Sequence, residues 1–120
     1  MRIGIRFSKH PEQESIITMK TDPLWGMIGL ARKAGKIAAG AFPAEKAIKK
    51  HHAFFVMIAE DASLNTRKQF QDMCSFRNIP CRVYGTKDLL GSSTGLEQRS
   101  VLAFTDPSFA EAVMKKLPEI

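Results

Sequence analysis

The sequence predicts an α/β fold, a three-layer α/β/α sandwich built around a four-stranded mixed sheet. Short apolar segments of strand length alternate with amphipathic segments of helix length, which is typical of layered domains made of βαβ-type units. The longest apolar run, residues 54–59, suits a central strand that is covered on both faces. The chain of 120 residues, 44% of them hydrophobic, holds enough apolar material for one core.

Two regions of the chain differ in pattern. Residues 1–22 are expected to form an N-terminal extension, either an extra edge strand or a disordered segment. Ile3, Ile5 and Phe7 alternate with arginine and glycine as in a strand, whereas the stretch that follows is polar. Residues 23–120 are expected to form the single domain, because all the alternating helix and strand patterns lie there.

Capping residues and prolines mark where the helices begin. Asp22 and Asp106 each precede a proline. An Asp side chain accepts hydrogen bonds from helical amides, and proline is tolerated at the first helical position. Ser63 and Thr86 can cap two further helices, and Pro43 is expected to open another. The five helices are expected over residues 23–34, 43–51, 63–77, 87–90 and 107–117.

Four strands are expected between these helices. Gly40 ends the first strand, and a loop over residues 91–99 precedes the last one. The strands are expected over residues 36–39, 54–59, 81–84 and 100–104.

The positive charge is concentrated in one part of the chain. The net charge is +6, and residues 23–53 carry six basic and one acidic side chain, while residues 54–120 hold eight of each. A clustered basic surface is typical of a protein that binds a polyanion. A solvated helix face would also be basic, but it does not explain why the rest of the chain is nearly balanced.

Several classes of function lack their sequence signals. The apolar runs are too short to span a membrane, and no signal peptide is apparent, so we expect a cytoplasmic protein without a membrane partner. Neither phosphate-cradling glycine motif occurs, and we expect no cofactor and no metal. Cys74 and Cys81 match no CxxC spacing and are expected to be free thiols.

Candidate catalytic residues are few. His51 and His52 are adjacent on an expected helix, where neighbouring side chains diverge and make a poor chelate. Glu60 and Asp61 follow the predicted central strand, where open α/β sheets place ligands, but acidic residues also suit the start of a helix. We therefore expect no enzymatic activity, and an enzyme that uses Glu60 and Asp61 is the least favoured alternative.

The positive functional signal is the junction between the first strand and the second helix. Gly40, Ala41, Phe42 and Pro43 lead into a helix that carries Lys46. Unpaired amides, the positive end of the helix dipole and the lysine would all face an incoming phosphate. The sequence therefore predicts an RNA-binding site at this junction.

Neighbouring residues extend this candidate site. Lys33 and Lys36 come from the end of the preceding helix and are expected to contact phosphates. Phe42 has two interpretations that remain open at this point. It can stack on a splayed base, or it can pack as a hydrophobic staple against Ala47 or Ile48.

The chain resembles the ribosomal L-seven-Ae (kink-turn RNA-binding) protein family, and in particular its bacterial YlxQ-like members. The resemblance runs from about residue 24 to residue 117. The matching segments are residues 28–36 (IGLARKAGK), Gly40, 46–48 (KAI), 56–63 (VMIAEDAS), 65–66 (NT), 78–80 (NIP), 85–87 (GTK), 90–91 (LG) and 95–97 (GLE). The resemblance implies an α/β/α sandwich that binds kinked RNA.

The family's RNA binders carry a Gly-x-Asn-Glu-x-x-Lys pattern at the start of the second helix. Gly40 and Lys46 match its first and last positions, whereas Phe42 and Pro43 replace the Asn and Glu that read guanines. Each bidentate base contact contributes roughly 1–3 kcal/mol of discrimination. The departure therefore predicts that RNA binding persists without strong selectivity for kink-turns.

The resemblance also implies a second contact loop before the last strand. In the family this loop covers an extruded base with a Leu/Ile-Glu-Val segment. Leu96 and Glu97 match that segment, and Gln98 stands in its third place.

The leading prediction is a non-catalytic, ribosome-associated or ribosomal-protein-like RNA-binding protein. Lys33, Lys36, Lys46 and Lys49 would contact phosphates of ribosomal or other structured RNA, and we expect a monomer. A protein-interaction module on the same fold is the alternative, with Phe42 and Pro43 forming an apolar contact. Binding that persists at high salt would distinguish it.

Overall fold

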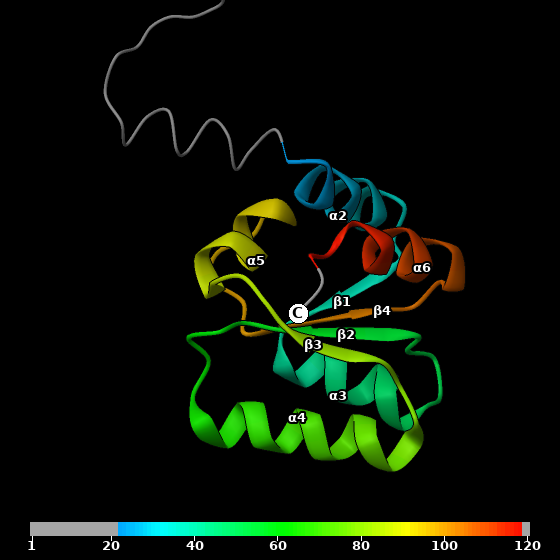
Figure 1. Ribbon diagram of the computed structural model, residues 1–120, viewed down its shortest axis with the longest axis vertical. Coiled ribbons are helices and arrows are strands. Elements are labelled where there is room, and N and C mark those ends of the chain that lie inside the picture. The colour runs from blue at the N-terminus through cyan, green and yellow to red at the C-terminus, as the bar shows by residue number, and fades with distance from the viewer. Residues whose placement is uncertain (1–21, 119–120) are drawn as a thin grey trace, which may run out of the picture.

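The computed structural model describes residues 22–118 (Figure 1), so the expected N-terminal extension lies outside the described residues except for Asp22. Five helices and four strands alternate along these residues. In chain order they are α2 (Pro23–Lys33), β1 (Ile37–Ala39), α3 (Ala41–Lys49), β2 (Phe55–Ile58), α4 (Leu64–Arg77), β3 (Cys81–Val83), α5 (Lys87–Ser93), β4 (Val101–Phe104) and α6 (Pro107–Lys116).

The helices form two layers around one mixed sheet. Figure 1 shows α2, α5 and α6 over one face of the sheet and α3 and α4 over the other. The strand order is β1-β4-β2-β3, with β2 and β3 parallel and the other two pairs antiparallel. The predicted three-layer α/β/α sandwich with a four-stranded mixed sheet is therefore confirmed.

The core lies on both faces of the two central strands. Every residue of β2 and β4 is buried, which explains why these strands are continuous apolar runs rather than alternating ones. Phe55 and Phe104 lie opposite each other in the sheet, with ring centroids 5.6 Å apart. Phe70 of α4 and Leu24 and Ile28 of α2 add large buried side chains from the two helical layers.

The predicted helix caps form as expected. Asp22 Oδ1 accepts a hydrogen bond from the Leu24 amide at 2.9 Å. Asp106 Oδ2 accepts one from the Phe109 amide at 3.0 Å, and α2 and α6 both begin with proline. Ser63 and Thr86 likewise accept from amides three residues later in α4 and α5. Local side-chain chemistry thus determines where four of the five helices begin.

The start of α3 differs from the prediction. The helix begins at Ala41, with Gly40 as its N-cap residue, so Pro43 lies within the first turn instead of opening the helix. The amides of the first turn have no intrahelical partner, and proline is therefore tolerated anywhere in that turn. Consequently the predicted glycine loop is shorter than expected, and Phe42 and Pro43 belong to the helix.

The end of α5 also differs from the prediction. Gly91 was expected to begin a loop, but α5 continues to Ser93. A Cβ atom added at Gly91 would lie 2.0 Å from the carbonyl oxygen of Glu97. Gly91 is thus a site of close backbone approach inside a helix, and its lack of a side chain allows the following loop to fold back onto α5.

Candidate nucleic-acid interface

The exposed start of α3 forms the first part of the candidate site. Gly40 adopts a positive φ of 112°, a conformation that L side chains rarely adopt, and this turn takes the chain from β1 into α3. No side chain caps the amides of the first turn. Ala41, Phe42 and Pro43 are all exposed there. This turn therefore presents amides and the positive end of the helix dipole to solvent.

Phe42 does not act as a hydrophobic staple. Its side chain is 75% exposed, whereas Ile48 of the same helix is fully buried. An aromatic ring that is held at a helix start and exposed to solvent is available to stack on a base. The exposure of Phe42 is therefore inconsistent with the hydrophobic staple, and stacking on a base stays a prediction.

The loop before β4 lies beside the start of α3. β1 pairs antiparallel with β4, so the end of β1 meets the beginning of β4. The Gly40 amide donates a hydrogen bond to the Val101 carbonyl oxygen at 2.8 Å. The two segments that the family resemblance implies, which are 50 or more residues apart in sequence, are thus joined by the sheet.

Arg99 connects these two segments, and sequence reasoning missed it. Its Nη1 donates to the carbonyl oxygens of Glu97 at 3.2 Å and Gln98 at 2.8 Å. Its side chain also passes Gly40, where an added Cβ atom would lie 3.5 Å from the Arg99 Cδ. Arg99 therefore shapes the loop and brings a guanidinium group to the start of α3. Its position immediately after residues 96–98 was the only signal in the sequence.

Backbone and side-chain hydrogen bonds hold the loop against α5. The Leu96 amide donates to the Gly91 carbonyl oxygen at 2.8 Å, and Gln98 Nε2 donates to Asp88 Oδ1 at 2.8 Å. Leu96 is half-buried, whereas Glu97 and Gln98 are exposed. Of the three predicted loop residues, Glu97 and Gln98 thus present polar groups at the surface, and Leu96 is only partly accessible.

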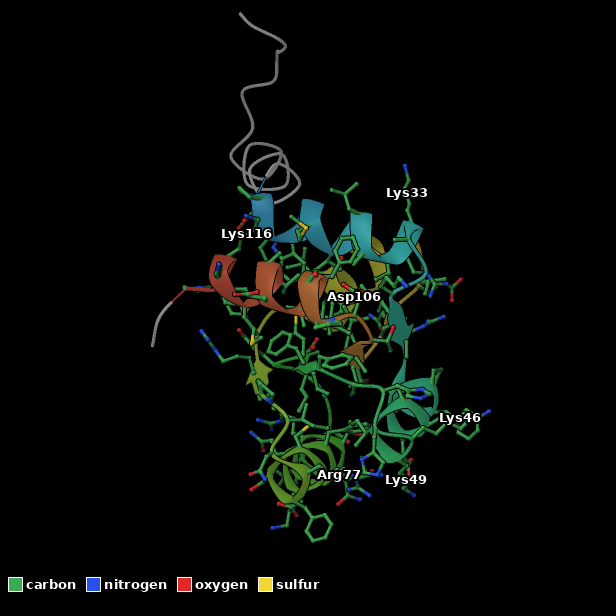
Figure 2. All side chains as sticks on the ribbon, turned by 90° about the vertical axis from the view of Figure 1, so that its right-hand side faces the viewer. Lys33, Lys46, Lys49, Arg77, Asp106 and Lys116 are labelled. Atoms are coloured by element: carbon green, nitrogen blue, oxygen red, sulfur yellow. The ribbon has the colours of Figure 1, made fainter. Side chains whose placement is uncertain are left out.

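The predicted lysines lie along one side of the domain. Figure 2 shows Lys33 projecting from the layer of α2 and Lys46 from that of α3, both on the side where β1 runs. Lys36 is exposed immediately before β1. Lys49 instead forms an ion pair with Glu45, with 2.8 Å between Nζ and Oε2. Lys33, Lys36 and Lys46 therefore form a basic edge beside the candidate site, and Lys49 is partly neutralised.

Glu60 and Asp61 have a structural role in the turn between β3 and α5. Glu60 Oε2 accepts a hydrogen bond from the Gly85 amide at 3.2 Å, and Asp61 Oδ1 accepts one from the Lys87 amide at 2.8 Å. Carboxylates that fasten a backbone turn in this way account for both residues without catalysis. Among residues 22–118, no three His, Cys, Asp or Glu side chains gather as a metal site.

The two cysteines are free and lie side by side. Cys74 is buried in α4 and Cys81 is half-buried at the start of β3. A hydrogen bond between the two thiols raises the pKa of Cys74, which burial raises further, and lowers the pKa of Cys81.

Within the described part of the chain, no helix is long and apolar enough to cross a membrane.

The chain matches a known family over most of its length. Residues 24–114 match the sequence profile of the ribosomal protein L7Ae/L30e/S12e/Gadd45 family. The chain is 36% identical to the RNA-binding protein YlxQ of Bacillus subtilis (strain 168) over 91 residues, which are 76% of this chain and 91% of that protein. It is 33% identical to the RNA-binding protein YlxQ of Enterococcus faecium over 85 residues, 71% of this chain and 82% of that protein.

Solved structures show the same fold. A Bacillus halodurans protein of unknown function superposes with a TM-score of 0.76 at 26% identity, covering 79% of this chain and 96% of the other. The 15.5kD RNA binding protein of Giardia lamblia superposes with a TM-score of 0.66 at 18% identity, covering 94% and 96%. The profile match and the two YlxQ relatives show that this chain belongs to the ribosomal protein L7Ae/L30e/S12e/Gadd45 family.

Proposed function

We propose that this protein is a non-catalytic RNA-binding protein that docks structured RNA at the start of α3 and the adjoining loop. The juxtaposition of these two segments carries the proposal. The Arg99 guanidinium reaches the exposed first turn of α3 at Gly40, and the basic edge formed by Lys33, Lys36 and Lys46 runs along the same side of the domain, from α2 to α3. Membership of a family with RNA-binding relatives supports the same assignment.

Each predicted residue has a distinct part in this proposal. The amides of Ala41 and Phe42 and the side chains of Lys36 and Lys46 contact phosphates, and Lys33 extends that contact towards α2. The exposed Phe42 ring stacks on an unpaired base. The segment Leu96, Glu97 and Gln98 closes over a second base, supported by the hydrogen bonds that hold it against α5.

The departure from the family pattern limits the selectivity of this site. Phe42 and Pro43 offer no side-chain donor or acceptor to a guanine edge, and Pro43 has no amide hydrogen. Glu45 does not take over that role, because its carboxylate is paired with Lys49. We propose that affinity comes mainly from phosphate contacts and stacking, on ribosomal or another structured RNA, and that kink-turn preference is weak.

Fluorescence anisotropy tests this function. A kink-turn RNA, a duplex of the same length and a single strand are titrated with the full chain at low and at moderate salt. We expect salt-sensitive binding, with the kink-turn favoured by less than about tenfold, since two lost base contacts of roughly 1–3 kcal/mol each remove most discrimination. A large kink-turn preference that persists with salt would overturn the selectivity claim. Absence of binding to all three RNAs would overturn the function.

Ribosome association is tested separately. Cosedimentation of the purified chain with ribosomes at low salt, followed by release at high salt, is the expected result for a protein held by phosphate contacts. A protein-interaction module that uses Phe42 as an apolar contact would instead stay bound at high salt.

A further inference from the structure

A groove lies between α2 and α5, on the opposite face of the sheet from α3. Its volume is about 510 Å³, which is within the range of pockets that hold a small ligand. Gly26, Gly29 and Leu30 of α2 form one wall, and the end of α5 and Gly95 form the other. Figure 1 shows both helices on the same face of the sheet.

Small residues keep this groove open. A Cβ atom added at Gly26 would have nothing within 4 Å, whereas one at Gly29 would lie 3.3 Å from the Ser93 carbonyl oxygen. The two helix backbones therefore approach closely at Gly29 and diverge towards Gly26. Leu30 is 57% exposed between them and offers an apolar surface.

The two walls differ in chemistry. On the α5 wall, the hydroxyls of Ser92, Ser93 and Thr94 donate to carbonyl oxygens of their own helix, at 3.4, 3.2 and 2.8 Å. Because the Ser92 and Ser93 protons are used within the helix, their oxygens present acceptors to a ligand, whereas Thr94 is buried. On the α2 wall, Arg32 and Lys33 supply positive charge. The groove thus combines acceptors, an apolar surface and cations.

The groove is continuous with the proposed RNA site. Lys33 belongs both to the groove and to the basic edge, and Gly95 directly precedes the loop segment that begins at Leu96. The loop over residues 95–99 thus borders the groove at Gly95 and the start of α3 at Arg99. The concentration of charge in residues 23–53, which include all of α2, favours a nucleic acid over a protein as the occupant.

We propose that the groove between α2 and α5 binds an unpaired nucleotide that flanks the structured RNA, and that its base carries an exocyclic amine. The base lies on Leu30, its amine donates to the hydroxyl oxygens of Ser92 and Ser93, and its phosphate faces Arg32 and Lys33. Adenine, cytosine and guanine have such an amine, whereas uracil does not. This proposal rests on the proposed RNA-binding function and extends its footprint.

Three RNAs test the proposal. All three share one structured core. One ends bluntly, the second ends in four unpaired adenosines, and the third ends in four unpaired uridines. For the wild-type chain we expect the adenosine overhang to raise affinity about fivefold or more over the blunt RNA, the lower end of one bidentate hydrogen-bonded base contact. The uridine overhang should raise affinity less. Equal affinity for blunt and adenosine-tailed RNA overturns this proposal but leaves the proposed function intact. The same equal affinities are expected if the groove binds a protein instead.

Two substitutions localise the effect. Leu30→Asp places a negative charge in the groove and should abolish the gain from the adenosine overhang without weakening binding of the blunt RNA by more than about twofold, because the blunt core does not enter the groove. Phe76→Asp is the matched control, since Phe76 is 82% exposed on α4 in the opposite layer. An overhang gain that survives Leu30→Asp contradicts the assignment of this groove.

A second measurement does not depend on the structured core. Amide NMR spectra of the full chain are recorded while the dinucleotide ApA is added. The proposal predicts saturable shifts at Gly26, Gly29 and Gly95, which line the groove, and smaller ones with UpU. Shifts confined to residues elsewhere would overturn the groove as the site, even if structured RNA binds.

Discussion

At the scale of single residues, the candidate site depends on three residues with different roles. Phe42 is exposed at the start of α3 and contributes an aromatic surface. Arg99 spans from the loop before β4 to Gly40. Gly40 makes the turn into α3 because it adopts a positive φ, which L side chains rarely adopt. The surface therefore arises from one aromatic ring, one guanidinium group and one glycine.

The exposed ring of Phe42 leads to a first prediction. Stacking contributes about 1–3 kcal/mol per base, so Phe42→Ala should weaken RNA binding by roughly 5- to 150-fold. The unfolding free energy of the Phe42→Ala variant should differ from that of the wild type by less than about 0.5 kcal/mol, because the side chain is exposed. Anisotropy titration and urea unfolding measure the two quantities.

The matched control for this change is Phe76→Ala. Phe76 is another strongly exposed phenylalanine, at 82%, but it lies on α4 away from the basic edge. The Phe76→Ala substitution should leave RNA affinity unchanged. Equal effects of the two substitutions would mean that Phe42 has no special contact with RNA.

At the scale of elements, the contact between α5 and the following loop positions the second half of the site. The Glu97 carbonyl oxygen occupies the space where a Gly91 side chain would begin. The Leu96 amide donates to the Gly91 carbonyl oxygen in the same contact. The loop can therefore reach the start of α3 only while residue 91 lacks a Cβ.

Gly91→Ala should consequently destabilise the fold. Overpacking of a tight contact costs about 1–3 kcal/mol, and displacement of the loop should also lower RNA affinity. Gly26→Ala is the control within a helix, because a Cβ there meets nothing within 4 Å. It should stabilise the protein by roughly 0.5–1 kcal/mol. If both variants unfold at the same urea concentration, the described contact at Gly91 is wrong.

The elements also show which features could be predicted from the sequence. Four caps and two Asp-Pro pairs are local, so the starts of α2, α4, α5 and α6 were correctly predicted. The predicted start of α3 at Pro43 was wrong, because proline is accepted throughout the first turn of a helix. Arg99 and the close approach at Gly91 depend on how β1 pairs with β4 and on how a loop folds back, and such non-local contacts leave no local pattern.

At the scale of the whole molecule, the candidate site lies along one edge of the α/β/α sandwich. The buried hydrophobic residues that the structure describes lie between Leu24 and Leu117, and they come from both helical layers and the sheet. The family match spans residues 24–114. We propose that residues 23–120 form an independent domain and that residues 1–22 are an extension to it, of which Asp22 caps α2.

Removal of residues 1–21 tests this organisation. The shortened chain should unfold cooperatively, with an unfolding free energy within about 0.5 kcal/mol of the full chain, because the described core is retained. Urea unfolding monitored by circular dichroism measures it. A chain that is unfolded or much less stable after this deletion would show that the extension completes the core.

The central claim is that RNA binds along the basic edge beside α3. The most direct test compares Lys36→Glu/Lys46→Glu with Lys115→Glu/Lys116→Glu, which alters net charge equally on α6. Figure 2 shows Lys116 on the opposite side of the domain from Lys46. RNA affinity is measured by anisotropy at several salt concentrations, and the slope of its logarithm against that of salt reports phosphate contacts.

For Lys36→Glu/Lys46→Glu we predict weaker binding to every RNA and a slope reduced in magnitude by about 1.4–1.8, or 0.7–0.9 for each lost phosphate contact. The α6 variant should keep the wild-type slope. If the two variants weaken binding equally, net charge alone explains the affinity. If neither weakens it, RNA does not bind at this edge.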